Sequence, residues 1–182
     1  ETVDRPMGIP RFELGALRVQ NLIDSKTIEM PESLGISEEK IQNTTKELMN
    51  IANHSVKSNN QWINIVSNAE MSCLALSTEL TSKGIENIIA IDERTTRILA
   101  EKPENLEEIM SSKLHTKIAL FKKALSIFSQ FRFIRSTELV YVAFKKGVLK
   151  VTGSKALEAV LYATKYKGSS VSFDEIDVLK RL

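Results

Sequence analysis

Length, composition and charge predict a globular protein with an ordinary apolar core. The chain has 182 residues, of which 42% are hydrophobic and 26% are charged, and its formal net charge is +2. This composition suits one soluble domain, or one domain with an appendage. No apolar run reaches the roughly 18 residues that a membrane span needs, and no secretory signal is visible, so we expect a cytoplasmic protein without membrane contact.

Cys73 is the only cysteine. It excludes disulfides within the chain, and its apolar helical setting predicts a buried thiol.

The charge is distributed unevenly along the sequence. Residues 1–110 carry 11 Lys or Arg and 18 Asp or Glu, whereas residues 111–182 carry 14 and 5. An acidic part beside a basic part is compatible with a metal site next to a polyanion site. It is equally compatible with two complementary, solvated surfaces.

The first sixty residues predict mainly helices. Apolar residues recur at helical spacing over 11–25, and Ser37 is a candidate N-cap of a second helix that ends near Asn53. Between them, residues 27–30 are a short strand candidate that Pro31 stops. The polar stretch 54–60 is expected to be a loop.

The middle of the chain predicts a strand, a helix and a second strand. Residues 62–66 are apolar, and Ser67 and Glu70 match the S-x-x-E pattern of a capping box at the start of a helix. That helix is expected to end near Gly84. Residues 85–91 are continuously apolar, which is typical of a parallel strand buried on both faces. A strand, a crossover helix and a strand in this order indicate an α/β fold.

The rest of the chain becomes increasingly helical. Short helices are expected over 93–101 and 104–112, an outer strand over 116–119 and a helix over 121–131. From Ser136 onward the capping signals are those of three helices. The sequence therefore predicts an α/β domain over residues 1–133 and a basic helical appendage over residues 134–182.

Two carboxylates in the middle region are candidate metal ligands. Asp92 directly follows the predicted buried strand, at the edge where open α/β sheets bind ligands, and Glu70 lies in the first turn of the preceding helix. Carboxylates from different elements are the ligands that Mg²⁺ and Mn²⁺ prefer for hydrolysing phosphodiesters. Both residues also have a structural interpretation: Asp92 as the N-cap of the next helix, and Glu70 as the reciprocal partner of Ser67.

Polar residues after Asp92 extend this candidate site. Glu93 is a candidate outer ligand or a solvated first-turn residue, and Thr95 and Thr96 are candidates to hydrogen-bond a ligand or metal-bound water. Arg94 and Arg97 are candidate phosphate contacts, although exposed helical arginines often have no such role.

The stretches Asn-Ala-Glu-Met-Ser-Cys-Leu-Ala-Leu-Ser-Thr-Glu-Leu and Ile-Ile-Ala-Ile-Asp-Glu-Arg-Thr-Thr-Arg resemble the second half of a PIN domain. The likeness covers about residues 1–120 and is most specific over 67–100. It implies a compact three-layer α/β/α fold with a parallel sheet. The run Arg-Ser-Thr-Glu-Leu-Val-Tyr-Val-Ala-Phe further along the chain resembles archaeal PIN-like proteins.

The resemblance implies a Mg²⁺- or Mn²⁺-dependent endoribonuclease. Glu70, Asp92 and Thr96 match acidic and small polar positions of the family's site, and Glu1 has the spacing of a further acidic residue on an early helix. The family's first strand and its near-invariable Asp have no counterpart in the sequence. The alternative is therefore a catalytically degenerate PIN-like module that binds RNA or a protein partner, including a second copy of itself.

The basic residues of the second part are candidate contacts to an RNA backbone. Together with Arg94 and Arg97 they are Lys122, Lys123, Arg132, Arg135, Lys145 and Lys146. The aromatic residues among them are interpreted as core rather than as stacking surfaces: Phe131, Phe133, Tyr141 and Phe144.

Overall fold

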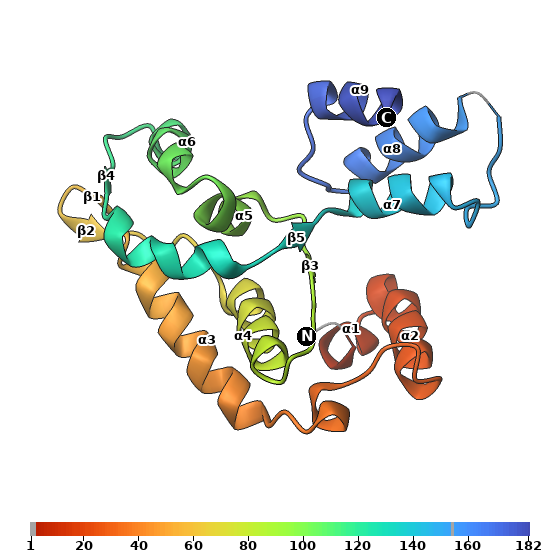
Figure 1. Ribbon diagram of the computed structural model, residues 1–182, viewed down its shortest axis with the longest axis horizontal. Coiled ribbons are helices and arrows are strands. Elements are labelled where there is room, and N and C mark those ends of the chain that lie inside the picture. Colours follow the sequence, from red (N-terminus) through yellow and green to blue (C-terminus); the bar gives the residue numbers. More distant parts are fainter. Residues whose placement is uncertain (1–2, 154) are drawn as a thin grey trace. The chain divides into compact units, whose positions relative to one another are not determined.

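A computed structural model describes residues 3–153 and 155–182 (Figure 1). The chain divides into two compact units, residues 1–41 and 42–182. None of the helices in the described residues combines the length and the apolar character that crossing a bilayer requires.

The first unit is a small helical assembly. Helix α1 (Asp4–Met7) packs against α2 (Pro10–Asp24), and the 3₁₀ helix η1 (Pro31–Leu34) follows. Helix α2 begins at Pro10 because the fixed φ of proline suits the first helical position. The strand predicted over 27–30 is wrong. The backbone N–H groups of Thr27 and Ile28 bond back to the carbonyl of Leu22 at 2.9 and 3.0 Å, which closes a turn.

The second unit contains a three-stranded antiparallel sheet with the order β2-β1-β4. It follows helix α3 (Glu38–Asn53), and its strands are β1 (Val56–Ser58), β2 (Gln61–Trp62) and β4 (Ala119–Leu120). The loop predicted over 54–60 is wrong at Val56–Ser58, which forms β1. Asn59 and Asn60 adopt positive φ values of 46° and 62°. Two such residues form the tight turn that joins twisted strands into a hairpin.

A parallel pair of short strands lies elsewhere in the same unit. Strand β3 (Ile89–Ala90) pairs with β5 (Phe133–Ile134), side by side in Figure 1. The prediction of a strand over 85–91 buried on both faces is wrong in extent and in burial. Ile89 is 7% exposed, but Ile88 is 52% exposed. Strand β3 meets β5 on one side only among the described strands, so its apolar run is not enclosed by a larger sheet.

Helices and 3₁₀ segments surround these strands and form the core. They are α4 (Asn68–Ser82), α5 (Arg94–Glu101), η2 (Pro103–Asn105), α6 (Leu106–Leu114) and η3 (Lys122–Gln130), the last in place of the α-helix expected over 121–131. Met71, Leu74, Leu99 and Phe128 are completely buried. The prediction of a buried Cys73 is wrong, because this residue is exposed.

Three helices form the C-terminal part of the second unit: α7 (Ser136–Lys145), α8 (Ala156–Tyr166) and α9 (Phe173–Arg181). Their own small core contains Leu161, Val171 and Ile176. The domain boundary expected at residue 133 stays a prediction. The fold is mixed α/β and mostly helical, with two small sheets in the described residues.

Candidate anion-binding cleft

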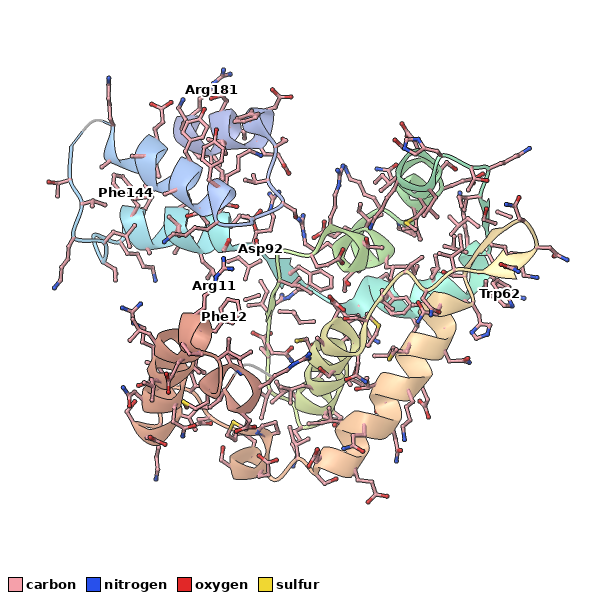
Figure 2. The ribbon with its side chains drawn as sticks, turned by 180° about the vertical axis from the view of Figure 1, so that it is seen from behind. Arg11, Phe12, Trp62, Asp92, Phe144 and Arg181 are labelled. Atoms are coloured by element: carbon pink, nitrogen blue, oxygen red, sulfur yellow. The ribbon has the colours of Figure 1, made fainter. Side chains whose placement is uncertain are left out.

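Asp92 joins three separate segments of the second unit. Its carboxylate Oδ1 accepts hydrogen bonds from the backbone N–H of Ser136 at 3.1 Å and from the hydroxyl of Ser169 at 2.9 Å. Its carbonyl accepts a hydrogen bond from the hydroxyl of Ser170. The residue therefore connects the end of β3 with the first residue of α7 and with the segment before α9 (Figure 2).

These contacts keep Asp92 ionised. Partial burial opposes the charged form, but the hydrogen bonds from Ser136 and Ser169 and the positive charge of Arg97 outweigh it, so the pKa of Asp92 is lowered. A carboxylate at the N-terminus of α7 also interacts favourably with the helix dipole.

Glu93 takes the capping role that was one interpretation of Asp92. Helix α5 begins at Arg94, and the two carboxylate oxygens of Glu93 accept hydrogen bonds from the backbone N–H groups of Thr95 and Thr96 at 2.9 and 2.7 Å. Burial opposes ionisation, yet these hydrogen bonds leave the pKa of Glu93 lowered. The N-cap of α5 is therefore Glu93, and the interpretation of Asp92 as this N-cap is wrong by one residue. Thr95 and Thr96 are buried, 6% and 0% exposed, under the first turn of α5.

Glu70 is the reciprocal partner of Ser67, as its structural interpretation predicted. Its Oε2 accepts a hydrogen bond from the backbone N–H of Ser67 at 2.9 Å and also contacts the Ser67 hydroxyl. Glu1 lies outside the described residues. Within residues 3–153 and 155–182, no group of three or more His, Cys, Asp or Glu side chains is placed to hold a metal ion.

Arg135 links α7 to α9 from a buried position. It is 8% exposed, and its guanidinium donates to Glu138 Oε1 at 2.6 and 2.9 Å and to Glu175 Oε1 at 2.5 Å. Burial opposes the charge of Arg135, but the two carboxylates outweigh it and raise its pKa. Glu175 also accepts a hydrogen bond from the backbone N–H of Ser172 at 2.7 Å, and its pKa is lowered.

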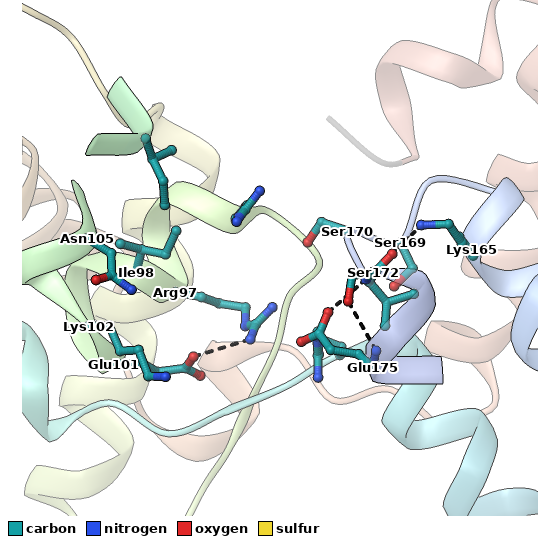
Figure 3. A pocket seen from close by; sticks show the side chains of 14 residues that line it. Arg97, Ile98, Glu101, Lys102, Asn105, Lys165, Ser169, Ser170, Ser172 and Glu175 are labelled. Atoms are coloured by element: carbon teal, nitrogen blue, oxygen red, sulfur yellow. Dashed lines mark hydrogen bonds and ion pairs between the residues drawn. The ribbon is translucent and has the colours of Figure 1, made fainter. Parts of the chain in front are cut away.

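A cleft of about 620 Å³ opens beside these contacts, between α5 and the segment that leads into α9 (Figure 3). Glu101 and Glu175 are its two carboxylates, and each is paired with an arginine, Glu101 with Arg97 at 3.2 Å. Three serine hydroxyls also face the cleft. Its five cationic side chains are Arg94, Arg97, Lys102, Arg135 and Lys165.

The surplus of positive charge makes the cleft suitable for an anion. Within the described residues, Arg94 and Lys102 form no ion pair and are exposed. Guanidinium groups donate paired hydrogen bonds that match the geometry of phosphate oxygens. The hydroxyls of Ser169 and Ser170 already donate to Asp92, whereas the Ser172 hydroxyl accepts from the N–H of Glu175 and keeps its proton to donate. The arrangement can therefore bind a phosphate without rearranging the buried Arg135.

The structure gathers some of the predicted basic residues and separates others. Arg94, Arg97 and Arg135 line the cleft. The others lie elsewhere: Arg132 lines a smaller cavity of about 280 Å³ beside Asn87, and exposed lysines lie at the start of η3 and at the end of α7, namely Lys122, Lys123, Lys145 and Lys146.

Sequence reasoning missed the half of the cleft that comes from residues 165–175. Lys165, Ser169, Ser170 and Ser172 line it, and two of these serines hydrogen-bond Asp92. The serine-rich run just before the capping box of α9 was the available signal. Its pairing with a residue 77 positions earlier in the chain leaves no local pattern.

Comparison with protein-family models, with curated proteins and with solved structures finds no match to this chain.

Proposed function

We propose that this chain binds RNA and that the cleft between α5 and α9 takes phosphates of the RNA backbone. The observation that carries the proposal is the excess of cations around the cleft. Its two carboxylates are paired with Arg97 and Arg135, and Arg94, Lys102 and Lys165 form no ion pair within the described residues. The basic balance of residues 111–182 supports it, because a polyanion is attracted by the summed charge as well as by single contacts.

The proposal is tested by fluorescence anisotropy of a labelled oligouridylate in a buffer with EDTA. The variant Arg94→Ala/Lys102→Ala removes two cleft cations that have no ion pair in the described chain, so little of the fold is disturbed. We expect a loss of affinity of about tenfold or more, and a weaker dependence on salt, because fewer counterions are released on binding.

The matched control is Lys145→Ala/Lys146→Ala, which removes the same charge from exposed positions at the end of α7. A clearly smaller loss in this control supports binding at the cleft. Equal losses in the two variants would indicate general electrostatic attraction and would contradict the proposal.

A second candidate function is a PIN-like, Mg²⁺- or Mn²⁺-dependent endoribonuclease. It is favoured by the position of Asp92, an ionised carboxylate that follows a parallel strand and is hydrogen-bonded to two serines of the cleft. The three-layer PIN-like fold belongs to this second proposal, as do Glu70 and Glu1 as further ligands.

The nuclease proposal is tested by cleavage of labelled RNA with Mn²⁺, with EDTA and with the variant Asp92→Asn. Cleavage that both treatments abolish, in a variant whose circular dichroism is unchanged, would support it. Binding without cleavage under every condition would leave the RNA-binding function alone.

A further inference from the structure

A group of exposed aromatic rings lies on the antiparallel sheet of the second unit. We define the aromatic platform as the rings of His54, Trp62 and Phe121 together with the side chain of Lys57, which lies over two of them. The Trp62 ring lies 5.3 Å from the ring centroids of both His54 and Phe121, in edge-to-face arrangements. The Lys57 ammonium lies 4.1 Å from the centroid of Trp62 and 5.8 Å from that of Phe121. Trp62 is 42% exposed and Phe121 is 47% exposed.

The strand register explains why these side chains share one face. Lys57 is directly opposite Trp62 in the β1–β2 pair and opposite Ala119 in the β1–β4 pair. Phe121 is two positions beyond Ala119, which returns its side chain to the same face, and its N–H bonds the carbonyl of Ser55 at 2.8 Å. The tight Asn59-Asn60 turn fixes this register.

The two chain segments that supply the platform carry charged side chains of one sign only. Residues 54–69 and 109–137, the two segments that supply it, contain seven Lys or Arg and no Asp or Glu. Lys122 and Lys123 directly follow Phe121 and are exposed. On helix α3, the nearest carboxylate before His54 is that of Glu47, about two helical turns away. A basic surface of this kind attracts a polyanion more strongly than it attracts a protein surface with few acidic residues.

We propose that the aromatic platform stacks the bases of single-stranded RNA, while Lys57 and Lys122 bind the neighbouring phosphates. Aromatic side chains in a basic surface are the usual means by which proteins hold single strands without reading their sequence. This inference rests on the proposed RNA binding and adds the class of substrate, a single strand with accessible bases. Trp62 and Asp92 are well separated in Figure 2, so the platform is a second contact surface beyond the cleft.

The test uses the fluorescence of Trp62, which is the only tryptophan of the chain and therefore reports from the platform itself. The full chain is titrated with an oligouridylate and with an abasic oligonucleotide of equal length, which has the phosphates but no bases. We expect the oligouridylate to quench Trp62 and the abasic strand to bind more weakly with little quenching.

The variant Phe121→Leu keeps an apolar side chain but removes one ring. We expect its affinity for the oligouridylate to fall about fivefold or more, and its affinity for the abasic strand to stay nearly unchanged. Phe12→Leu is the matched control, because Phe12 is an equally exposed ring, 50% exposed, with Arg11 lying 5.4 Å from its centroid. It should leave both affinities unchanged.

The outcomes separate this inference from the proposed function. Anisotropy that reports binding while Trp62 stays unquenched would overturn the platform and leave the cleft in place. Equal quenching by the abasic strand would also overturn it, since bases would not be needed. Trp62 fluorescence that changes with protein concentration alone would identify an interface between copies and overturn it. Failure of either strand to bind would overturn both proposals.

Discussion

The two basic regions of the second unit differ in what surrounds their cations. Beside the cleft, Arg135 is buried between Glu138 and Glu175, with hydrogen bonds of 2.5–2.9 Å. On the aromatic platform, Lys57 lies over the rings of Trp62 and Phe121, and the segments that build the platform have no carboxylate.

The difference distinguishes charges that hold the fold from charges that are free to bind. A buried cation between two carboxylates cannot leave without exposing unpaired charge, so its main contribution is to stability. A cation over an exposed ring is held weakly and can move to a phosphate at little cost. Net charge alone does not separate the two cases, because both regions are positive.

The largest effect is expected from Arg135→Met. This substitution leaves Glu138 and Glu175 without their shared partner, and we expect a loss of about 3 kcal/mol in the free energy of unfolding. Urea denaturation followed by circular dichroism measures it. The control is Lys180→Met, which removes an exposed cation paired with Glu158 at 2.6 Å and should change stability far less. Similar losses in the two variants would contradict the distinction between buried and exposed pairs.

The next largest effect is expected at Asp92, where one carboxylate holds three segments together. Asp92→Ala removes the acceptor of the Ser136 and Ser169 hydrogen bonds, and we expect a loss of about 2 kcal/mol. Asp92→Asn keeps a carbonyl acceptor and should lose about half as much. An alanine variant as stable as the parent would show that Asp92 does not join these segments in solution.

Acid is expected to destabilise the fold through three carboxylates of the cleft region. The pKa values of Asp92, Glu93 and Glu175 are lowered in the folded chain. Their stabilisation is therefore complete above the unfolded-state pKa values of about 4, and it is lost as the pH falls through the lower folded-state values. Unfolding measured between pH 7 and pH 3 should show stability falling below about pH 4, with a shallower fall in Asp92→Asn. An identical pH profile in both proteins would contradict this assignment.

Local patterns predicted the parts of the fold that depend on neighbours in the sequence. The capping box of Ser67 and Glu70 and the helix that follows it were confirmed. The cap of α5 was placed one residue early, because Asp and Glu side chains both suit that role and spacing alone does not choose between them.

The features that sequence reasoning missed depend on partners far along the chain. Strand β1 was predicted as a loop because Lys57 and Ser58 are polar, yet it pairs with both β2 and β4. The cleft needs residues near 94 and near 170. The carboxylate of Asp92, which joins these segments, accepts hydrogen bonds from serines 44 and 77 positions away. A window of neighbouring residues does not contain this information.

The smallest effect is expected from Lys57→Met, and it tests the other side of the comparison. Methionine keeps the apolar stem over Trp62 and removes the ammonium, so we expect a loss of only about 0.5 kcal/mol in the free energy of unfolding. Circular dichroism is the suitable measurement, because Trp62 fluorescence responds directly to the removal of the charge. Lys117→Met is the control for removing one positive charge from the same part of the chain.

A loss of about 2 kcal/mol or more would mean that Lys57 holds the sheet together, as Arg135 holds the C-terminal helices, and that it is not free to leave the ring for a phosphate. A small loss, together with weaker binding of oligouridylate, would show a cation that contributes to binding while contributing little to the fold.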